Sequence, residues 1–451
     1  MDTQHTARDA APEGPGLATM AKLALTLPRR GDAAFDDLFD RYGDVIWVSP
    51  PPLISRLLPG GFNVAVLRDP ALIKPLFAAP ADDADVAEPH RVKDPFSGDR
   101  SVFLLDGPDH RRLRKAMLPR LRGNALTQWR EFIVARTEQE VRGWADQPTV
   151  AVYPRMLELC LEVILKVGMS VPDSAMPQWK SAWQDLLTTA ASGQAARRSA
   201  LRSFGALRLW PRFQRELHRC NELVFDEIAR RRRQPEFEHD DVVDSLMRAD
   251  GNALSDSEVR DQVFAIMIGA YGPPAALASW AIERLVRTPH ALAAATAEAR
   301  GGDGQTAYLD AVMQESLRLR PPFVLVARRI PRPVSAAGRY FPGGTTIVAV
   351  IHSVQRHPNH YDDPGSFRPE RFLQQRPTTY GLIPFGVGEH RCLGDRLAIF
   401  EVTHILATVL RSVNLAAVDP RDEPVRIETD IFLSLTHVPG ERATVRATRV
   451  A

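Results

Sequence analysis

One segment restricts what this chain can fold into more than any other: residues 385–402, FGVGEHRCLGDRLAIFEV. Gly386 and Gly388 permit a tight and unusual backbone just before Cys392. An apolar helix face is predicted downstream, at Ile399, Val402, Leu406 and Val409. Cys392 is therefore expected at or near a helix N-terminus, where free N–H groups and the positive helix end favour a thiolate.

The chemistry of such a cysteine leaves two interpretations. A thiolate in a glycine-rich hollow, with His390 beside it, suits a soft or borderline metal such as iron. The alternative is an inert cysteine, because free cysteine is commonly buried. A zinc site is poorly supported, because the chain has three cysteines and no second cysteine-rich cluster to supply ligands.

The bulk composition indicates a globular protein in a reducing compartment. Of the 451 residues 44% are hydrophobic and 25% charged, and the net charge of +2 gives no reason to expect a nucleic-acid partner. Three cysteines exclude a disulfide scaffold. No apolar run approaches the roughly 20 residues of a membrane span, and the first 19 residues lack the pattern of a secretory signal. We therefore expect a soluble, cytoplasmic protein.

The order of periodic segments predicts a mainly α fold with minor β (α+β). Short strand-type runs are expected at 44–50 and 62–67, and helix from about 107 to 320 with breaks at 170–177 and 248–258. Further strands are expected at 323–330, at 344–351 and near the C-terminus. Because the strand-type runs lie far apart in sequence, we expect one interwoven domain over 21–451, a helix-rich part plus a small β-rich region, after a disordered lead-in over 1–20.

Two helical segments carry charged pairs. In YLDAVMQESLRLRPP, Glu315 and Arg318 lie three residues apart and can form an ion pair, which on spacing alone is most often an exposed one. In LLDGPDHRRLRKAM, His110 and Arg114 share one helix face and can hold an anion together, although such basic residues are usually only a solvated face.

Taken in this order, these segments resemble the cytochrome P450 family. The cysteine segment is similar to its haem-binding signature through Phe385, Gly388, Cys392 and Gly394. Glu315 and Arg318 resemble its Glu-x-x-Arg signature, and FRPERF, with Arg371, resembles the segment that completes that ion network.

The resemblance implies roles for these residues. Cys392 would be the axial ligand of the iron of haem b (iron protoporphyrin IX). The haem propionates would be held by His110, Arg114, Arg328 and His390. A structural ion network that locks the cysteine loop would comprise Glu315, Arg318 and Arg371.

The segment GAYGPPAALASW lies in the long helix that crosses the haem in that family. A capping box at Ser255 and Glu258 starts this helix, which is expected to run to about Arg287, on the order of 50 Å. Family members carry an acid and an alcohol in its middle for proton delivery, and the resemblance places Gly272 and Pro273 there. We expect a kink at a local widening of the helix, where a proline costs less than in an ideal helix.

The function that the resemblance implies is a haem-thiolate monooxygenase served by a separate ferredoxin and ferredoxin reductase. The alternative is a peroxide-driven or other non-monooxygenase enzyme, because some family peroxygenases also carry Pro at the alcohol position, although after Arg rather than Gly272. A basic docking face is expected from Arg111, Arg112, Lys115, Arg120, Arg122, Arg391 and Arg396.

The substrate pocket implied by the same resemblance comprises Ala270, Tyr271, Phe323, Val324, Leu325 and Phe432. These residues are mostly apolar, which predicts a hydrophobic or mixed small molecule. Basic residues within 195–212 could meet an acidic or carrier-protein-bound substrate, or could be a solvated helix face. The Ala-, Arg- and Pro-rich composition is typical of a bacterial protein of specialised metabolism, by analogy only.

Overall fold

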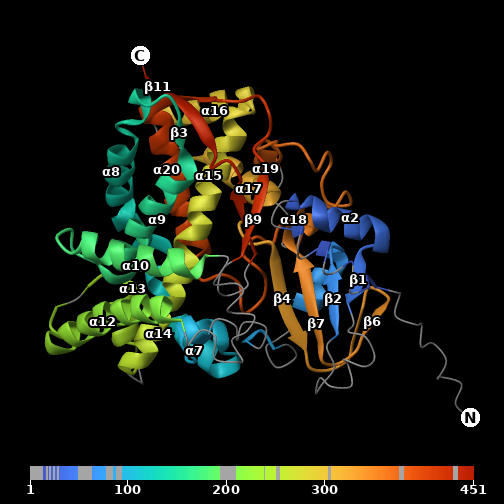
Figure 1. The fold of residues 1–451 in the computed structure, drawn as a ribbon, viewed down its shortest axis with the longest axis horizontal. Coiled ribbons are helices and arrows are strands. Elements are labelled where there is room, and N and C mark those ends of the chain that lie inside the picture. Colours follow the sequence, from blue (N-terminus) through green and yellow to red (C-terminus); the bar gives the residue numbers. More distant parts are fainter. Residues whose placement is uncertain are drawn as a thin grey trace, which may run out of the picture.

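The computed structural model separates a helical part from a sheet-rich part (Figure 1). It describes residues 14–16, 19, 22–23, 26–27, 30–48, 63–77, 85–87, 94–192, 210–237, 239–249, 254–302, 306–374, 380–429 and 435–450. The expected lead-in over 1–20 lies almost entirely outside these residues, as does Phe432.

The helical part packs around one large apolar core, which contains Trp183 and Phe264 at 4.7 Å between ring centroids. Its helices are α7 (Gly107–Met117), α8 (Arg130–Val141), α9 (Val152–Met169), α10 (Met176–Ala190), α12 (Pro211–Arg233), α13 (Val242–Met247), α14 (Asp256–Ala270), α15 (Gly272–Val286), α16 (Pro289–Arg300), α17 (Ala307–Leu319) and α20 (Asp395–Ser412). Short helices are α6 (Asp94–Ser97) and α19 (Arg371–Gln374).

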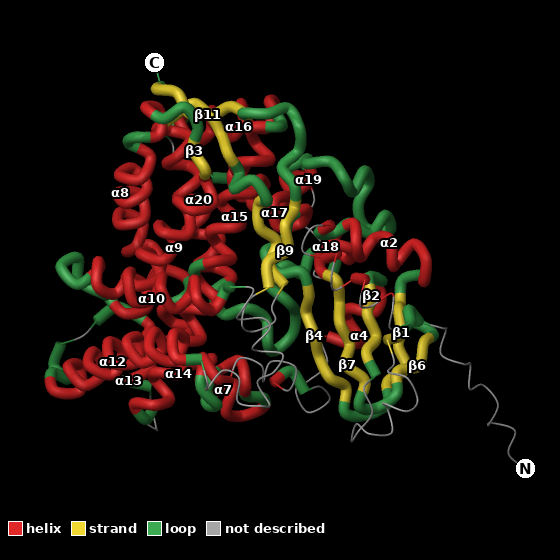
Figure 2. The backbone as a smooth tube through the Cα atoms, viewed as in Figure 1, coloured by secondary structure: helices red, strands yellow, loops and turns green. Residues whose placement is uncertain are grey.

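The larger sheet joins distant parts of the chain, as Figure 2 shows. Its order is β1 (Val45–Val48), β2 (Val64–Leu67), β7 (Thr345–Val350) and β4 (Leu325–Ile330). Strands β2 and β7 are parallel, with Val64 opposite Thr346, and the other pairs are antiparallel. Three short helices accompany this sheet: α2 (Ala33–Tyr42), α4 (Ile73–Phe77) and α18 (Ile351–Gln355).

The remaining strands form small antiparallel sheets. They are β3 (Val150–Ala151) with β11 (Thr444–Arg449) and β8 (Val413–Ala417), β9 (Val425–Thr429) with β10 (Leu435–Pro439), and β5 (Val334–Ala336) with β6 (Arg339–Phe341). The prediction of a mainly helical chain with a minor sheet that combines early and late segments is confirmed.

The long helix expected from residue 255 to 287 is divided in two at Tyr271. Ser255 and Glu258 form the predicted capping box, and α14 then runs to Ala270. Pro273 and Pro274 occupy the first turn of α15. Proline is tolerated there because first-turn N–H groups have no partner within their own helix. The prolines therefore cost little, since they begin a new helix instead of interrupting an existing one.

This divided helix also has a membrane-like composition. Asp256–Val286 is the one part of the described chain that is long and apolar enough to cross a membrane. However, 61% of its most apolar window is buried within the protein. It packs against α9, α20 and α17, which is the behaviour of a core helix.

Candidate functional site around Cys392

The backbone before α20 forms the tight loop that the glycines predicted. Gly386 and Gly388 have φ angles of 67° and 74°, a left-handed region that favours glycine. The Cys392 N–H donates to the carbonyl of Phe385 at 2.9 Å, and the Arg391 N–H donates to the carbonyl of Gly388 at 3.1 Å. These bonds hold Cys392 on a folded turn three residues before the first residue of α20.

The thiol of Cys392 lies deep in the molecule yet remains accessible. The residue is exposed by surface area, but burial is the largest influence on its thiol and raises its pKa. A bond from the Gly394 N–H and the charges of Arg114 and Arg391 act in the opposite direction. The backbone N–H at the helix end therefore favours the thiolate as expected, but burial outweighs it. Coordination to a metal would deprotonate the thiol.

An accessible thiol in a deep position indicates an internal hollow, and cationic side chains accompany it. The positive charge of Arg114 on α7 lowers the pKa of the Cys392 thiol. Partial burial in turn lowers the pKa of the Arg114 guanidinium. No carboxylate of the described residues lies within 4.0 Å of Arg114. Arg328 on β4 is 3% exposed, and burial lowers its pKa as well. A cation partly removed from water needs an anion nearby, so Arg114 fits an anionic ligand.

Two histidines belong to the same group. The rings of His110 and His390 stack at 3.8 Å between centroids. His390 Nε2 lies 2.8 Å from a carboxylate oxygen of Asp106, and the pKa of Asp106 falls to about 2 because His390 and the Ala87 N–H outweigh burial. His110 Nδ1 is buried without a hydrogen-bond partner among the described residues. Sequence reasoning gave no role to Asp106, although it lies within the motif LLDGPDHRRLRKAM that contains His110.

The charged pair on α17 is part of a completely buried network. Glu315 and Arg318 are both 0% exposed and make two hydrogen bonds of 2.7 and 2.8 Å. Arg371 adds a third charge, with its Nε donating to Glu315 at 3.1 Å. Arg318 also donates to the carbonyls of Pro364 and Ser366. The pair is therefore not the exposed one that spacing alone favours.

Gln355 on α18 connects this network to the cysteine loop. Its side-chain NH₂ donates to the carbonyls of Leu317 and Arg318 at 2.9 and 3.2 Å. Its side-chain oxygen accepts from the Ile383 N–H at 2.8 Å, two residues before Phe385. A lone glutamine carries no recognisable motif, so this link could be found only from the folded structure.

The middle of the divided helix opens onto a space. Residues 268–273 are all partly exposed, whereas 259–265 and 274–283 are buried. A Cβ added at Gly272 would meet nothing within 4 Å, and one at Gly269 would meet the ring of Phe103 at 3.8 Å. Because the helix lies in the core, this exposure indicates an internal hollow, with Gly272 and Phe103 at its wall.

The segment that carries Phe103 is held against α14. The oxygen and nitrogen of the Gln262 side chain bond the Val102 N–H and the Arg100 carbonyl at 2.9 and 2.8 Å. Asp261 accepts from the Arg100 N–H at 3.1 Å. Sequence reasoning missed Asp261 and Gln262, because their partners lie about 160 residues away.

The residues expected to line a substrate pocket are not all placed alike. Four of them are partly exposed: Ala270, Tyr271, Phe323 and Leu325. Val324 is 0% exposed and packs in the cluster that contains Phe35 and Phe39. Its side chain therefore belongs to the core, and the expectation that it contacts substrate is corrected.

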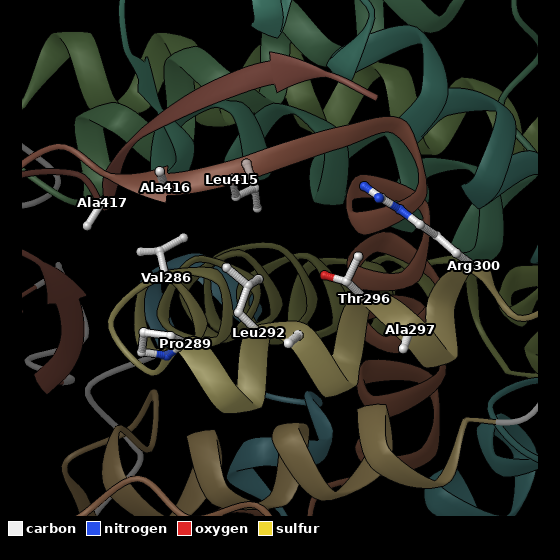
Figure 3. Close-up of a pocket in the computed structure, with 10 residues that line it drawn as sticks. Val286, Pro289, Leu292, Thr296, Ala297, Arg300, Leu415, Ala416 and Ala417 are labelled. Carbon is white, nitrogen blue, oxygen red and sulfur yellow. The ribbon is translucent and has the colours of Figure 1, made fainter. Parts of the chain in front are cut away.

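A separate apolar groove lies between α16 and β8. Figure 3 shows Leu292 and Thr296 on one side and Leu415 on the other. The groove shares no residue with the group around Cys392.

Comparison with known proteins identifies the family of this chain. The family model described as Cytochrome P450 matches residues 28–441. Cytochrome P450 137 of Mycobacterium tuberculosis is 35% identical over 97% of this chain and 90% of its own length. Cytochrome P450 135B1 of Mycobacterium bovis is 32% identical over 97% of this chain and 92% of its own length. Cytochrome P450 138 of the same organism is 30% identical over 78% of this chain and 80% of its own length. The chain belongs to the cytochrome P450 family.

Membership defines the general chemistry. Proteins of this family are haem-thiolate oxidoreductases, typically monooxygenases that act on small molecules. Haem is therefore the cofactor, and the residues present fit it. Cys392 offers a sulfur ligand on a loop held by two backbone hydrogen bonds, and Arg114, Arg328 and His110 offer positive charge and a hydrogen-bonding nitrogen that fit its carboxylates.

Proposed function

We propose that this protein is a haem-thiolate monooxygenase that oxidises a hydrophobic or mixed small molecule in a bacterial cytoplasm, with haem b as cofactor. The observation that carries the proposal is Cys392 on its positive-φ glycine loop beside Arg114, a half-buried cation without a carboxylate partner among the described residues. Cys392 would be the axial ligand, and the propionates would be held by His110, Arg114, Arg328 and His390. With a thiolate ligand, haem supplies oxygen activation by favouring O–O cleavage.

The chain's own residues would contribute little acid–base chemistry on the distal side. Gly272 carries no carboxyl group, and Pro273 carries neither a hydroxyl nor an N–H. The carbonyls of Gly269 and Ala270 therefore lack their usual α-helical donors, because residues 273 and 274 are both proline. These oxygens can accept a hydrogen bond from water or from a substrate hydroxyl in the space beside Gly272.

The Glu315–Arg318–Arg371 network would have a positioning role. It anchors α17 and the segment 362–368, and Gln355 continues it to Ile383. Restricting the loop before Cys392 would keep the sulfur at one height relative to the cofactor.

Electrons would come from a separate ferredoxin and its reductase. Support comes from the basic residues on α7 and before α20, although most of them have acidic neighbours. Arg111 pairs with Glu389, Arg112 with Glu258 and Arg120 with Asp240, and Asp395 serves both Arg122 and Arg391. Seven cations against these four carboxylates leave positive charge in excess, so we expect weak, salt-dependent docking of an acidic protein.

A second candidate function is peroxide-driven oxidation or another haem-thiolate reaction such as coupling, rearrangement or dehydration. The specific observation that favours it is the pair Gly272 and Pro273, which leaves the distal helix without an acid or an alcohol. Under this alternative, the electron-transfer proteins would be dispensable.

The experiment that separates these functions measures product formation from a compound panel in two arms. One arm supplies dioxygen, NAD(P)H, ferredoxin and reductase, and the other supplies peroxide alone. The monooxygenase proposal requires product in the first arm. Product only in the peroxide arm would replace it with the alternative.

Matched variants make the result specific to the distal helix. Gly272→Asp with Pro273→Thr restores an acid and an alcohol, and open space at Gly272 accommodates the added carboxyl. We expect this variant to convert a larger fraction of NAD(P)H into product in the dioxygen arm. Arg449→Gln is a control, because Arg449 is 80% exposed and lies outside both the distal helix and the proposed docking face.

A further inference from the structure

A buried cluster of metal-ligand type lies away from the group around Cys392. It consists of Asp32, the residue before α2, His352 on α18 and His437 on β10. Each offers one ligand atom, and these atoms all lie within 4.8 Å of one another. The side chains are 8%, 0% and 0% exposed. Three segments separated by more than 80 residues therefore converge on one point inside the protein.

The outward-facing nitrogen of each histidine has an oxygen partner. His437 Nδ1 lies 2.8 Å from the carbonyl of Pro321, and a carbonyl can only accept, so Nδ1 carries the hydrogen. His352 Nε2 lies 3.1 Å from the Ser353 hydroxyl and 3.5 Å from a carboxylate oxygen of Asp36. Metal-binding histidines are usually oriented in this way by a carbonyl or carboxylate on the other nitrogen.

The inward-facing atoms contact one another and no other polar group in the described part of the chain. Asp32 Oδ1, His352 Nδ1 and His437 Nε2 are buried polar atoms that make no hydrogen bond of regular geometry among the described residues, although His437 Nε2 and Asp32 Oδ1 form a close ion-pair contact. In the neutral histidines, both inward nitrogens present lone pairs to a carboxylate oxygen. His437 Nε2 lies 2.5 Å and His352 Nδ1 3.5 Å from that oxygen. Such an arrangement is stable only with a proton or a metal cation between the atoms.

We propose that Asp32, His352 and His437 form a binding site for one zinc ion or a similar borderline divalent transition metal. Two imidazoles and one carboxylate favour zinc over magnesium or calcium, which prefer oxygen ligands. Zinc bonds of about 2.0–2.2 Å place tetrahedral ligand atoms about 3.3 Å apart, so His437 and Asp32 must separate slightly on binding. Three protein ligands leave a fourth position for water.

The charges around the site set its strength. Arg356 lies 3.0 Å and Arg320 3.6 Å from the other carboxylate oxygen of Asp32, Oδ2. They orient the carboxylate with Oδ1 toward the histidines, but their positive charges weaken the binding of a dication. Asp36 contributes an opposing negative charge behind His352. We therefore expect a site that joins α2, α18 and β10 and binds zinc more weakly than a multi-cysteine site.

The test uses the full-length, haem-loaded protein without an affinity tag, stripped of other metals by a chelator. Calorimetric titration with zinc chloride is expected to give one equivalent per chain. Absorption at the zinc K-edge, where haem iron does not contribute, is expected to show nitrogen and oxygen neighbours at about 2.0–2.2 Å and no sulfur. Less than half an equivalent, or a sulfur neighbour, would overturn the proposal.

Variants assign the zinc to these residues. His437→Gln and Asp32→Asn are each expected to weaken zinc binding more than about 100-fold. His218→Gln is the matched control, because His218 is 74% exposed and far from the cluster in sequence, and it should bind zinc as the wild type does. Unchanged binding in His437→Gln would contradict the assignment. If the variants fail to fold, the wild-type edge spectrum alone decides the result.

Discussion

His110 lies flat against His390, with an angle of 15° between the ring planes. Burial, the neighbouring His390 and Arg114 lower the pKa of His110 to about 4, so its ring is neutral near pH 7. A positive charge on this ring would be repelled by Arg114. The neutral ring with a free Nδ1 can hydrogen-bond a carboxylate without adding charge, which suits a place beside a haem propionate.

Replacing Arg114 by Met should have opposite effects on the two forms of the protein. The apoprotein should be as stable as the wild type or more stable, because a half-buried cation without a carboxylate partner among the described residues is removed. Haem should dissociate about 10-fold or more faster, because a charge-assisted hydrogen bond contributes about 1.5–3 kcal/mol. Denaturation of the apoprotein and haem transfer to an acceptor protein measure the two quantities. Arg111→Met is the control, and equal haem retention in both variants would contradict the role of Arg114.

Glu315→Gln should destabilise the fold strongly. Arg318 would remain completely buried without its carboxylate, which costs about 3–5 kcal/mol of unfolding free energy. The same change at an exposed ion pair, Asp146→Asn beside Arg449, should cost less than about 1 kcal/mol. Urea denaturation of both variants gives the comparison, and similar values for the two would mean that the buried network adds nothing special.

Gln262→Leu should release the segment that carries Phe103. The substitution leaves the Val102 N–H and the Arg100 carbonyl without their partner, at about 1–3 kcal/mol for each group. Amide hydrogen exchange at residues 100–103 should become faster, while that of α9 stays unchanged. Gln128→Ala removes an exposed glutamine contact and serves as the control. Unaltered exchange at 100–103 would show that other contacts hold the segment.

Glu401 should make stability depend on pH. Its carboxyl on α20 is completely buried, and burial raises its pKa from 4.5 to about 8, against a smaller effect of Cys160. Because the folded-state pKa is the higher one, the stabilising proton is fully bound below pH 4.5 and is lost as the pH rises through about 8. The unfolding free energy should fall by up to about 1.4 kcal/mol per pH unit across this window.

Glu401→Gln removes that dependence, so its unfolding free energy should change less between pH 5 and 8 than that of the wild type. Glu138→Gln, at an exposed position, should keep the wild-type dependence. Parallel denaturation curves at several pH values provide the measurement, and identical slopes for Glu401→Gln and wild type would refute the assignment.

Local signals determined the framework of the protein from sequence alone. The glycines before Cys392, the capping box at Ser255 and the proline pair each act through backbone geometry within a few residues, so their structural effect can be read directly. The mainly helical fold with a minor sheet followed from periodicity for the same reason. The expected interruption at the prolines is present as a division of the helix at Tyr271, because prolines lack the N–H groups that an uninterrupted helix requires.

Only the tertiary structure decided what surrounds each of these elements. Burial and long-range partners determine whether Glu315 and Arg318 form a surface pair or a buried network, and neither is encoded in their spacing. Gln355, Gln262 and Asp106 gain their roles from backbone groups and side chains of other segments. The raised pKa of Cys392 likewise results from desolvation, a property of everything packed around the thiol. Asp32, His352 and His437 meet only because helix and strand packing brings three distant segments together.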